Sequence, residues 1–312
     1  MNLPVSAVTV VGIGSAAAAL AASARAAGLT VVAELTDPAA AVSSQSPAAV
    51  TRVLLAPSGV GREALAEVAV ALTRRGLPVW LDVAELAELG EFLPRERVGD
   101  RLGVVLTGPR KPSFARRAID VAVAAVALIA LLPFMLVVAV LVKCSSRGPV
   151  FHRAVVVGQD GQPFTWYKFR TMRVTGEDEG LRRRRFAEFV AGGGAPAKIV
   201  DAARVTAAGR FLRRHSLDEL PQLFSVLKGD MTLVGPRPCL AYEYELLKPW
   251  HRRRFAVRPG LTGLWQVRGR GRVHADEMAF MDIVYALGRS WRSDVRLLWA
   301  TAGVMLSGQG AT

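Results

Sequence analysis

The sequence has few of the features that mark secreted or multi-spanning proteins. It holds only two cysteines among 312 residues, so it lacks a disulfide framework and we expect a reducing compartment. Its first twenty residues carry no basic segment ahead of an apolar core, so we expect no signal peptide and a cytoplasmic N-terminus. Only one long apolar run is present, and one run cannot build a bundle of membrane-spanning helices.

Basic charge is concentrated in the second part of the chain. Residues 1–101 hold 8 basic and 10 acidic residues, a balance of −2, whereas residues 102–312 hold 32 and 16, a balance of +16. Such a surface favours a polyanionic partner, either nucleic acid, anionic lipid or a phosphorylated substrate. No helix-turn-helix, zinc or RNA-binding pattern organises the charge, so we expect no nucleic acid. Five of the six tryptophans share this region with the arginines, which suits a membrane interface, and the run Arg182 to Arg185 predicts a solvated or lipid-facing loop.

Strand-like and helix-like segments alternate in the first hundred residues, which predicts a parallel α/β sheet and a Rossmann-like domain over residues 1–105. Gly12, Gly14 and Ala17 form a permitted version of the dinucleotide-binding turn, and Glu34 ends the second strand, where a ribose-binding acid would lie. Tight glycine turns also serve the packing of a helix on a sheet, so we favour a vestigial or regulatory ligand site. The expected strands cover residues 7–12, 30–35, 52–56 and 78–83, and the expected helices run to residue 28 and over residues 62–75.

Every residue from Val121 to Val142 is apolar. A helix of this run would be about 33 Å long, enough to cross the hydrocarbon core of a bilayer. Pro133 removes a backbone hydrogen bond near the middle of the run and predicts a kink. Basic residues flank both ends, and positive residues mark the cytoplasmic side of a membrane. We therefore expect a re-entrant helix over about residues 119–143, with both ends in the cytoplasm; a crossing helix kinked at Pro133 is the alternative.

Residues 209–238 are the chemically richest segment of the chain. They combine several arginines, the adjacent carboxylates Asp218 and Glu219, and a Gly-Pro-Arg-Pro turn. A phosphoryl-transfer site needs guanidinium groups for the phosphate oxygens, a carboxylate as nucleophile or metal ligand, and rigid backbone near the anion. Ser216 and Glu219 also fit a capping box, in which they would only satisfy the first amides of a helix. Pro221 favours a helix that begins nearer Asp218, and the residues alone leave catalysis and capping equally open.

The same segment resembles the signature of the bacterial sugar transferases, the monotopic phosphoglycosyl transferases. The resemblance covers about residues 110–310 and implies a mostly helical, membrane-associated catalytic domain over residues 106–312. It identifies the chain as one of the larger members, which carry an N-terminal Rossmann-like domain. Further blocks that resemble the family are residues 116–120, 146–151, 167–172, 258–267 and 281–285.

This resemblance implies that the protein transfers a sugar-1-phosphate from a UDP-sugar to undecaprenyl phosphate and releases UMP. The reaction would run at the cytoplasmic face of the inner membrane, among its lipids, and would initiate exopolysaccharide, capsule or glycoconjugate assembly. Asp218 would be the nucleophile that carries a phosphosugar intermediate and Glu219 its partner; how the two divide Mg²⁺ binding and proton handling stays open. The substrate-binding residues that the resemblance implies are Arg213, Arg237, Lys168, Arg170 and, more weakly, Asp282.

A different class of function would place the activity in the N-terminal domain. The chain would then be a membrane-tethered nucleotide-binding sensor or an NAD-linked protein. A cofactor bound to residues 1–105, without release of UMP, would favour this alternative. The motifs do not specify the sugar, and they are compatible with a homodimer.

Overall fold

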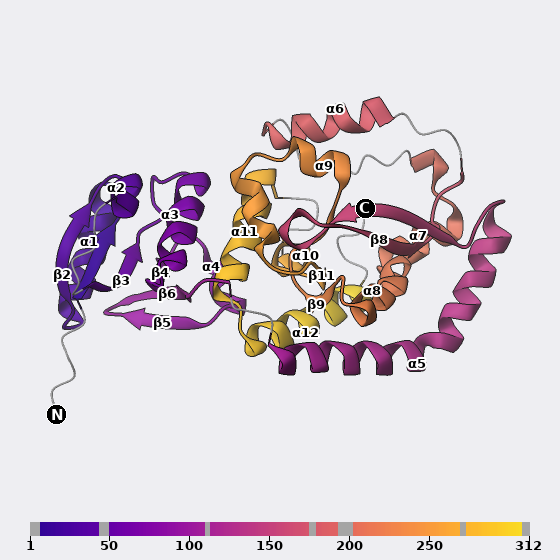
Figure 1. Ribbon diagram of the computed structural model, residues 1–312, viewed down its shortest axis with the longest axis horizontal. Coiled ribbons are helices and arrows are strands. Elements are labelled where there is room, and N and C mark those ends of the chain that lie inside the picture. Colours follow the sequence, from indigo (N-terminus) through magenta and orange to yellow (C-terminus); the bar gives the residue numbers. More distant parts are fainter. Residues whose placement is uncertain are drawn as a thin grey trace. The chain divides into compact units, whose positions relative to one another are not determined.

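The computed structural model of the chain describes residues 7–43, 50–109, 113–174, 179–192, 202–268 and 273–307 (Figure 1). The chain divides into two compact units, termed here the N-terminal and the C-terminal unit. The first comprises Met1–Lys111 with Ile283–Asp294, and the second comprises Pro112–Asp282 with Val295–Thr312.

One six-stranded sheet of order β2-β1-β3-β4-β6-β5 forms the N-terminal unit. Strands β1 to β4 run parallel, which confirms the predicted parallel α/β arrangement, whereas β6 runs antiparallel to both β4 and β5. The order of the first four strands matches flavodoxin-like sheets rather than the 3-2-1-4 order of the standard dinucleotide-binding fold. The strands are β1 (Ala7–Val11), β2 (Thr30–Leu35), β3 (Val50–Leu55), β4 (Val79–Asp82), β5 (Arg95–Val98) and β6 (Arg101–Leu106), and the helices are α1 (Gly14–Ala26), α2 (Pro38–Ser43), α3 (Arg62–Arg74) and α4 (Ala87–Phe92).

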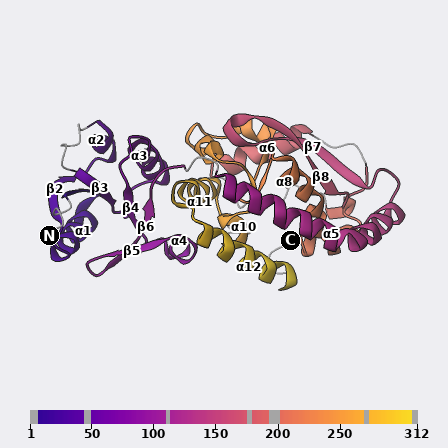
Figure 2. The same ribbon diagram turned by 60° about the horizontal axis from the view of Figure 1, so that its bottom comes forward.

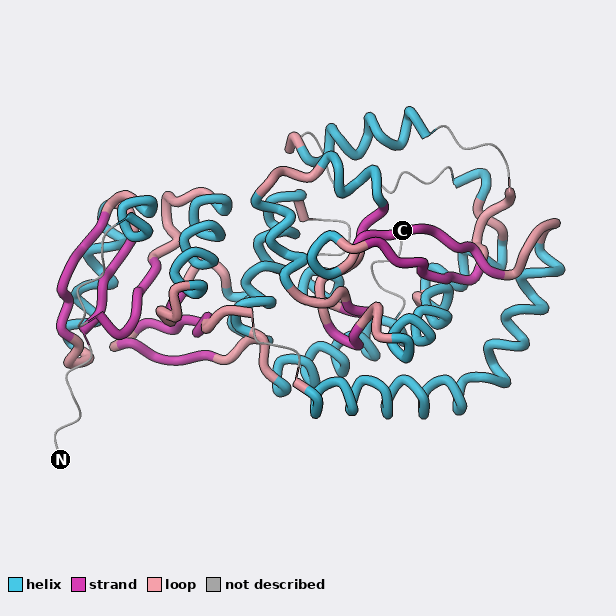
Figure 3. Tube along the Cα trace, viewed as in Figure 1, coloured by secondary structure: helices cyan, strands magenta, loops and turns pink. Residues whose placement is uncertain are grey.

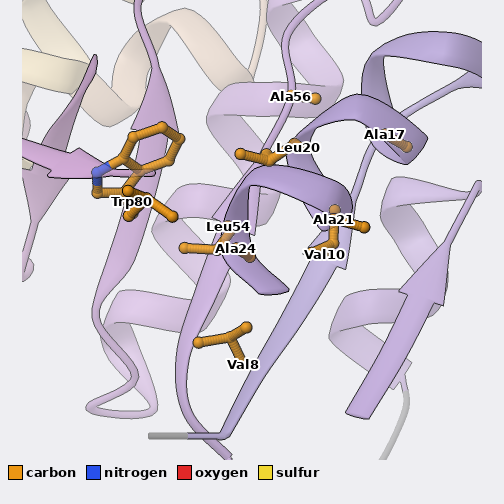
Figure 4. Packing of buried hydrophobic residues seen from close by; sticks show 10 residues of the cluster. Val8, Val10, Ala17, Leu20, Ala21, Ala24, Leu54, Ala56 and Trp80 are labelled. Atoms are coloured by element: carbon orange, nitrogen blue, oxygen red, sulfur yellow. The ribbon is translucent and has the colours of Figure 1, made fainter. Parts of the chain in front are cut away.

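The core of this unit forms where α1 packs on the sheet (Figure 4). Val10, Leu20 and Leu54 are fully buried there beside the indole of Trp80. The indole nitrogen of Trp80 donates a hydrogen bond to a β5 carbonyl, so the buried polar atom is satisfied. Gly103 on β6 makes room for the ring, because a Cβ at this position would lie 2.2 Å from a ring carbon. These contacts explain why a sheet with few large side chains can still bury a tryptophan.

In the C-terminal unit, helices surround two small sheets. The β7–β8 hairpin and β10 form one sheet of order β10-β7-β8, and β9 pairs with β11 in parallel (Figure 3). The strands are β7 (Phe151–Val157), β8 (Pro163–Phe169), β9 (Thr232–Val234), β10 (Cys239–Leu240) and β11 (Gly260–Thr262). The helices are α5 (Phe114–Ser145), α6 (Glu179–Val190), α7 (Ala207–Arg214), α8 (Leu223–Lys228), α9 (Ala241–Leu246) and α10 (Leu264–Arg268), with short 3₁₀ helices at Gln159–Gly161, Ala202–Arg204, Leu217–Gln222 and Trp250–Ala256; α11 (Ala275–Gly288) and α12 (Trp291–Ser307) are shared between the two units.

Four consecutive arginines, Arg182 to Arg185, lie inside helix α6 rather than in the loop that their charge predicts. The prediction was wrong because arginine is a good helix former, so a charged run does not by itself exclude a helix. The rings of Phe186 and Phe189 on the same helix are in tilted contact, and Phe189 and Val190 are buried in a hydrophobic cluster of the unit.

Helix α5 contains the predicted apolar run and crosses the front of the C-terminal unit in Figure 2. By length and composition it could cross a membrane, and 22% of its most apolar window is buried. Its buried residues form one stripe, whereas Val126, Ile129 and Leu136 are more than half exposed. Pro133 lies inside the helix, and Figure 1 shows that α5 changes direction along its length. An exposed apolar helix of this length is consistent with membrane association.

Polar contacts fix both ends of α5 to the unit. Near its start, the guanidinium of Arg117 donates to the carbonyl oxygens of Val226 and Leu227, at 2.6 and 2.8 Å, where α8 ends. One turn later the carboxylate of Asp120, which is buried, accepts hydrogen bonds from β9. At the far end Arg170, which follows β8, donates to two carbonyl oxygens of the last turn and its cap. The apolar helix is therefore attached at both ends to the elements that carry the site described next.

Candidate active site

The predicted catalytic residues lie in the 3₁₀ helix between α7 and α8. Ser216, the residue before this helix, has a left-handed backbone with φ of 55°, and its side chain makes no capping hydrogen bond. The carboxylate of Glu219 does not cap the helix either, because it forms ion pairs with Lys168 and Arg237. The capping-box alternative is therefore wrong. Left-handed backbone at a residue other than glycine is strained, and such strain is often found at functional sites.

Two cations from distant segments hold Glu219. Nζ of Lys168 on β8 lies 2.8 Å from Oε1 of Glu219, and Nη2 of Arg237 lies 3.0 Å from the same oxygen. A second, longer hydrogen bond of 3.4 Å joins Nη1 of Arg237 to Oε2, so the guanidinium faces the carboxylate with both ends of its fork. Burial would raise the pKa of Glu219, but the charges of Arg237 and Lys168 outweigh it and hold this pKa well below its usual range. Glu219 is therefore a fixed anion at neutral pH.

Asp218, the adjacent residue, is in a different electrostatic state. Burial raises the pKa of its carboxyl group above the ordinary value, although Lys168 and Arg213 act in the opposite direction. Within the described part of the chain, no hydrogen bond or ion pair engages this carboxylate, and Asp218 lines a cavity. Neighbouring carboxyl groups whose pKa values are pushed apart commonly divide the chemical work of a site. Of the two, Asp218 is the one whose carboxylate has no hydrogen-bond or ion-pair partner among the described residues.

The cavity beside Asp218 has a volume of about 1100 Å³ and is strongly basic. Ten lysine or arginine side chains line it, against two carboxylates, those of Asp218 and Glu243. A wall with this excess of positive charge attracts ligands that carry several negative charges. The basic residues are Arg153, Lys168, Arg170, Arg173, Arg182, Arg185, Arg204, Arg213, Arg237 and Arg254.

The sequence model of the bacterial sugar transferases matches residues 111–308. The chain belongs to this family. It is 38% identical over 230 residues to the exopolysaccharide production protein ExoY of Sinorhizobium fredii, an alignment that covers 70% of this chain and 94% of ExoY. It is 38% identical to the undecaprenyl-phosphate galactose phosphotransferase of Salmonella typhimurium, covering 65% of this chain and 42% of that protein. It is 36% identical to the UDP-glucose:undecaprenyl-phosphate glucose-1-phosphate transferase of Klebsiella pneumoniae, covering 60% of this chain and 39% of that protein. The chain thus spans less than half the length of the last two relatives.

Two predicted substrate-binding residues of this sugar transferase have other partners in the structure. Arg170 lines the cavity, but its guanidinium donates to the carbonyl oxygens of Val142 and Ser146 at the end of α5. Asp282 is fully buried, does not line the cavity and forms an ion pair of 2.7 Å with Arg254. Burial raises the pKa of Asp282 to about 6, against the opposing charge of Arg254.

Arg254 is a site residue that the sequence did not reveal. Its guanidinium is nearly buried, lines the cavity and donates a hydrogen bond of 2.9 Å to the backbone oxygen of Arg237. Arg254 therefore connects Asp282 to the Gly-Pro-Arg-Pro turn. In the sequence it is the last of three consecutive arginines, which we interpreted as part of a membrane interface, and no local pattern distinguishes it from its neighbours.

In the N-terminal unit of the transferase, each candidate cofactor-binding residue has a structural role of its own. A Cβ at Gly12 would lie 2.7 Å from the side chain of Ala56, so this glycine allows a close approach of backbone. Gly14 has a φ of 59°, which glycine adopts without strain, and Ala17 is part of the buried core. The carboxylate of Glu34 forms an ion pair with an arginine of α1. Packing accounts for Gly12 and Ala17, backbone conformation for Gly14 and an ion pair for Glu34, and ligand binding by the four residues stays a prediction.

The carboxylate of Asp218 is compatible with Mg²⁺, whereas both oxygens of Glu219 are already bonded to Lys168 and Arg237. Among the described residues there is no group of three or more His, Cys, Asp or Glu side chains that could hold a metal ion. Mg²⁺ does not require such a group, because it is commonly held by one or two carboxylates and completes its coordination with water and substrate phosphates. The unpaired Asp218 carboxylate on the cavity wall would be a first ligand of this kind.

Proposed function

We propose that this sugar transferase moves a sugar-1-phosphate from a UDP-sugar to undecaprenyl phosphate and releases UMP. One observation carries the proposal: an unpaired carboxylate, Asp218, lies on the wall of a cavity lined by ten basic side chains. A nucleotide diphosphate-sugar and a lipid phosphate are both polyanions. The β-phosphorus of the first must reach this carboxylate, and a phosphate oxygen of the second must then reach the same phosphorus. The printed names of the Salmonella and Klebsiella relatives describe reactions of this class, which supports the assignment.

The reaction takes place in two displacements. An oxygen of Asp218 attacks the β-phosphorus of the UDP-sugar; the bond to the bridging oxygen breaks, and its electron pair leaves with UMP. A phosphate oxygen of undecaprenyl phosphate then attacks the same phosphorus, forms the lipid diphosphate-sugar and returns Asp218 as a carboxylate. Arg213 and Arg237 neutralise the phosphate oxygens during both steps. Asp218 would hold Mg²⁺, which when bound supplies further positive charge at the diphosphate. Glu219 would join it as a ligand only by giving up its bonds to Lys168 and Arg237.

The fixed charge of Glu219 assists this chemistry indirectly. Because Glu219 stays ionised, Lys168 and Arg237 remain drawn to one point next to Asp218. Two cations kept at that point are preorganised for the charge that develops on the transferring phosphate. They do not need to reorganise when the donor binds.

We further propose that α5 is re-entrant and that the C-terminal unit lies at the cytoplasmic face of the membrane. Arg117 fixes one end of α5 and Arg170 fixes the other, and both belong to the same compact unit. A helix that crossed the bilayer would place its ends on opposite sides of the membrane, about 30 Å apart. One folded unit on one side could not form hydrogen bonds with both ends. Two exposed tryptophans of α12, Trp291 and Trp299, lie eight residues apart and hence on one helix face, as suits a membrane interface.

The test is UMP release by the detergent-solubilised full chain with Mg²⁺, undecaprenyl phosphate and a panel of UDP-sugars. The panel holds UDP-glucose, UDP-galactose and their N-acetylated forms, because the motifs do not specify which sugar is transferred. We expect turnover that requires the lipid and disappears in Asp218→Asn. Glu245→Gln, on an exposed face of α9, is the matched control that removes one carboxylate and should keep wild-type turnover.

A second measurement isolates the first displacement. Without the lipid, wild type should release about one UMP per chain and gain the mass of one phosphosugar, because the intermediate has no acceptor. Asp218→Asn should do neither. A phosphosugar adduct on Asp218→Asn, or turnover by this variant, would overturn the assignment of the nucleophile. If no UDP-sugar gave UMP, attention would pass to ligands of the N-terminal unit.

A further inference from the structure

The side chain of Trp166 lies beneath both cations that hold Glu219. Trp166 is on β8, two residues before Lys168, so the two side chains point to the same face of the strand. Nζ of Lys168 is 4.3 Å from the centroid of the Trp166 ring, and Cζ of Arg237 is 5.5 Å from it. Trp166 is only 7% exposed, yet it lines the cavity. One buried indole thus contacts two cations that come from segments about seventy residues apart in the sequence.

The balance of charge explains why an aromatic ring is useful at this position. Lys168 and Arg237 are both positive and converge on a single carboxylate oxygen of Glu219, at 2.8 and 3.0 Å, so they repel each other. The face of an indole carries the negative part of its quadrupole and attracts cations, most strongly where water is excluded. An aliphatic side chain could fill the same volume but would attract neither cation. The ring therefore supplies an attraction that the one carboxylate cannot provide alone.

We propose that Trp166 is a positioning residue for sugar-phosphate transfer, whose ring holds Lys168 and Arg237 where both reach Glu219 and face the diphosphate of the donor. The inference rests on the proposed function and adds to it a residue that acts through two others. Its consequence is that the aromatic face of residue 166, and not only its bulk, determines the rate of the first displacement.

The first experiment compares Trp166→Phe, which keeps an aromatic face, with Trp166→Leu, which keeps apolar bulk alone. The readout is the single-turnover rate of UMP release by the full chain without lipid acceptor. We expect Trp166→Phe to stay within about threefold of wild type and Trp166→Leu to lose about 10- to 100-fold, mostly in the rate and less in the KM for the UDP-sugar. Equal rates for the two variants would overturn the proposal.

Fluorinated tryptophan gives a readout that a merely structural role would not change. Each added fluorine weakens the attraction of the ring for a cation while its size hardly changes. Chains labelled at every tryptophan with one and then two ring fluorines should show a stepwise fall in the UMP rate. The same labels in Trp166→Phe should have no effect, because only the other five tryptophans then carry fluorine. An equal fall in both backgrounds would contradict a role for Trp166.

A binding measurement separates this inference from the proposed function. If wild type released no UMP from any UDP-sugar, the proposed function would fail, but the paired cations would still form an anion site. Calorimetric titration of the full chains with inorganic pyrophosphate then tests the ring directly. We expect Trp166→Leu to bind pyrophosphate about tenfold more weakly than Trp166→Phe. Equal affinities in wild type and both variants would overturn the role of the ring whatever reaction the protein catalyses.

Discussion

Asp120 should be a main determinant of stability in the C-terminal unit. Its carboxylate is 8% exposed and accepts hydrogen bonds from Oγ1 of Thr232, at 2.6 Å, and from the backbone nitrogen of Leu233, at 3.3 Å. Both donors are themselves buried, so Asp120→Ala would leave two polar groups without a partner and without water. Hydrogen bonds to a charged group contribute about 1.5–3 kcal/mol each, so the variant should lose about 3–6 kcal/mol.

This loss can be measured as a shift in the thermal unfolding of the detergent-solubilised chain, followed by tryptophan fluorescence, because four of the six tryptophans belong to this unit. For a unit of this size about 3–6 kcal/mol corresponds to a fall in Tm of about 6–24 °C. Thr232→Val removes one of the two donors and should cost about 1–3 kcal/mol in wild type. In the Asp120→Ala background the same change should cost almost nothing, because its partner is already gone.

Two results would refute this reasoning. One is a loss below about 1 kcal/mol for Asp120→Ala, which would mean that water or another group replaces the carboxylate. The other is an equal cost of Thr232→Val in both backgrounds, which would mean that the two side chains are not coupled. Asp120→Asn serves as the control for bulk, because it keeps the size and one acceptor oxygen and should lose about half as much.

Three further predictions concern other parts of the chain. Cys239 is buried, and burial raises the pKa of its thiol to about 12, so maleimide at pH 8 should label only the exposed Cys144; label on native Cys239 would contradict this. Burial raises the pKa of Asp282 from 3.8 to about 6, so the folded state binds this proton more tightly than the unfolded state does. The free energy of unfolding should therefore fall by about 3 kcal/mol as pH rises from about 4 to about 6. Asp282→Asn should flatten that part of the pH profile of Tm, and identical profiles would disprove the effect. Replacing Trp291 and Trp299 with Phe should remove most of the quenching of fluorescence by brominated lipids in reconstituted chain, and undiminished quenching would place this face of α12 away from the bilayer.

The elements that the sequence predicts well are those that depend on local pattern. The apolar run predicts α5, and the four parallel strands agree with expectation to within about two residues, because hydropathy and turn residues act over short distances. The β5–β6 edge is missing from the prediction. Its first strand, Arg95–Val98, has only four residues and three of them are charged, so it lacks the apolar alternation that marks a strand.

The chemistry of the site is predictable in part. Family resemblance selected Glu219, Lys168 and Arg237, and the structure brings these three side chains into direct contact. Trp166 and Arg254 were missed because their roles depend on partners that lie far away in the sequence. The contacts of Trp166 with two cations, and of Arg254 with the backbone oxygen of Arg237, follow no regular spacing in the sequence. Only the folded chain therefore reveals them.

One residue, Phe169, separates Lys168 from Arg170, so the covalent chain fixes the distance between the candidate active site and the apolar helix. Lys168 bonds to Glu219 in the candidate site, and Arg170 donates a hydrogen bond at the end of the apolar helix. Their Cα atoms lie about 7 Å apart along the extended chain. Under the proposed transfer to a lipid phosphate, this fixed spacing sets the depth at which the phosphate must lie, independently of the length of the lipid tail. The enzyme should therefore accept polyprenyl phosphates of different chain length at similar rates while remaining sensitive to anything that moves their head group up or down.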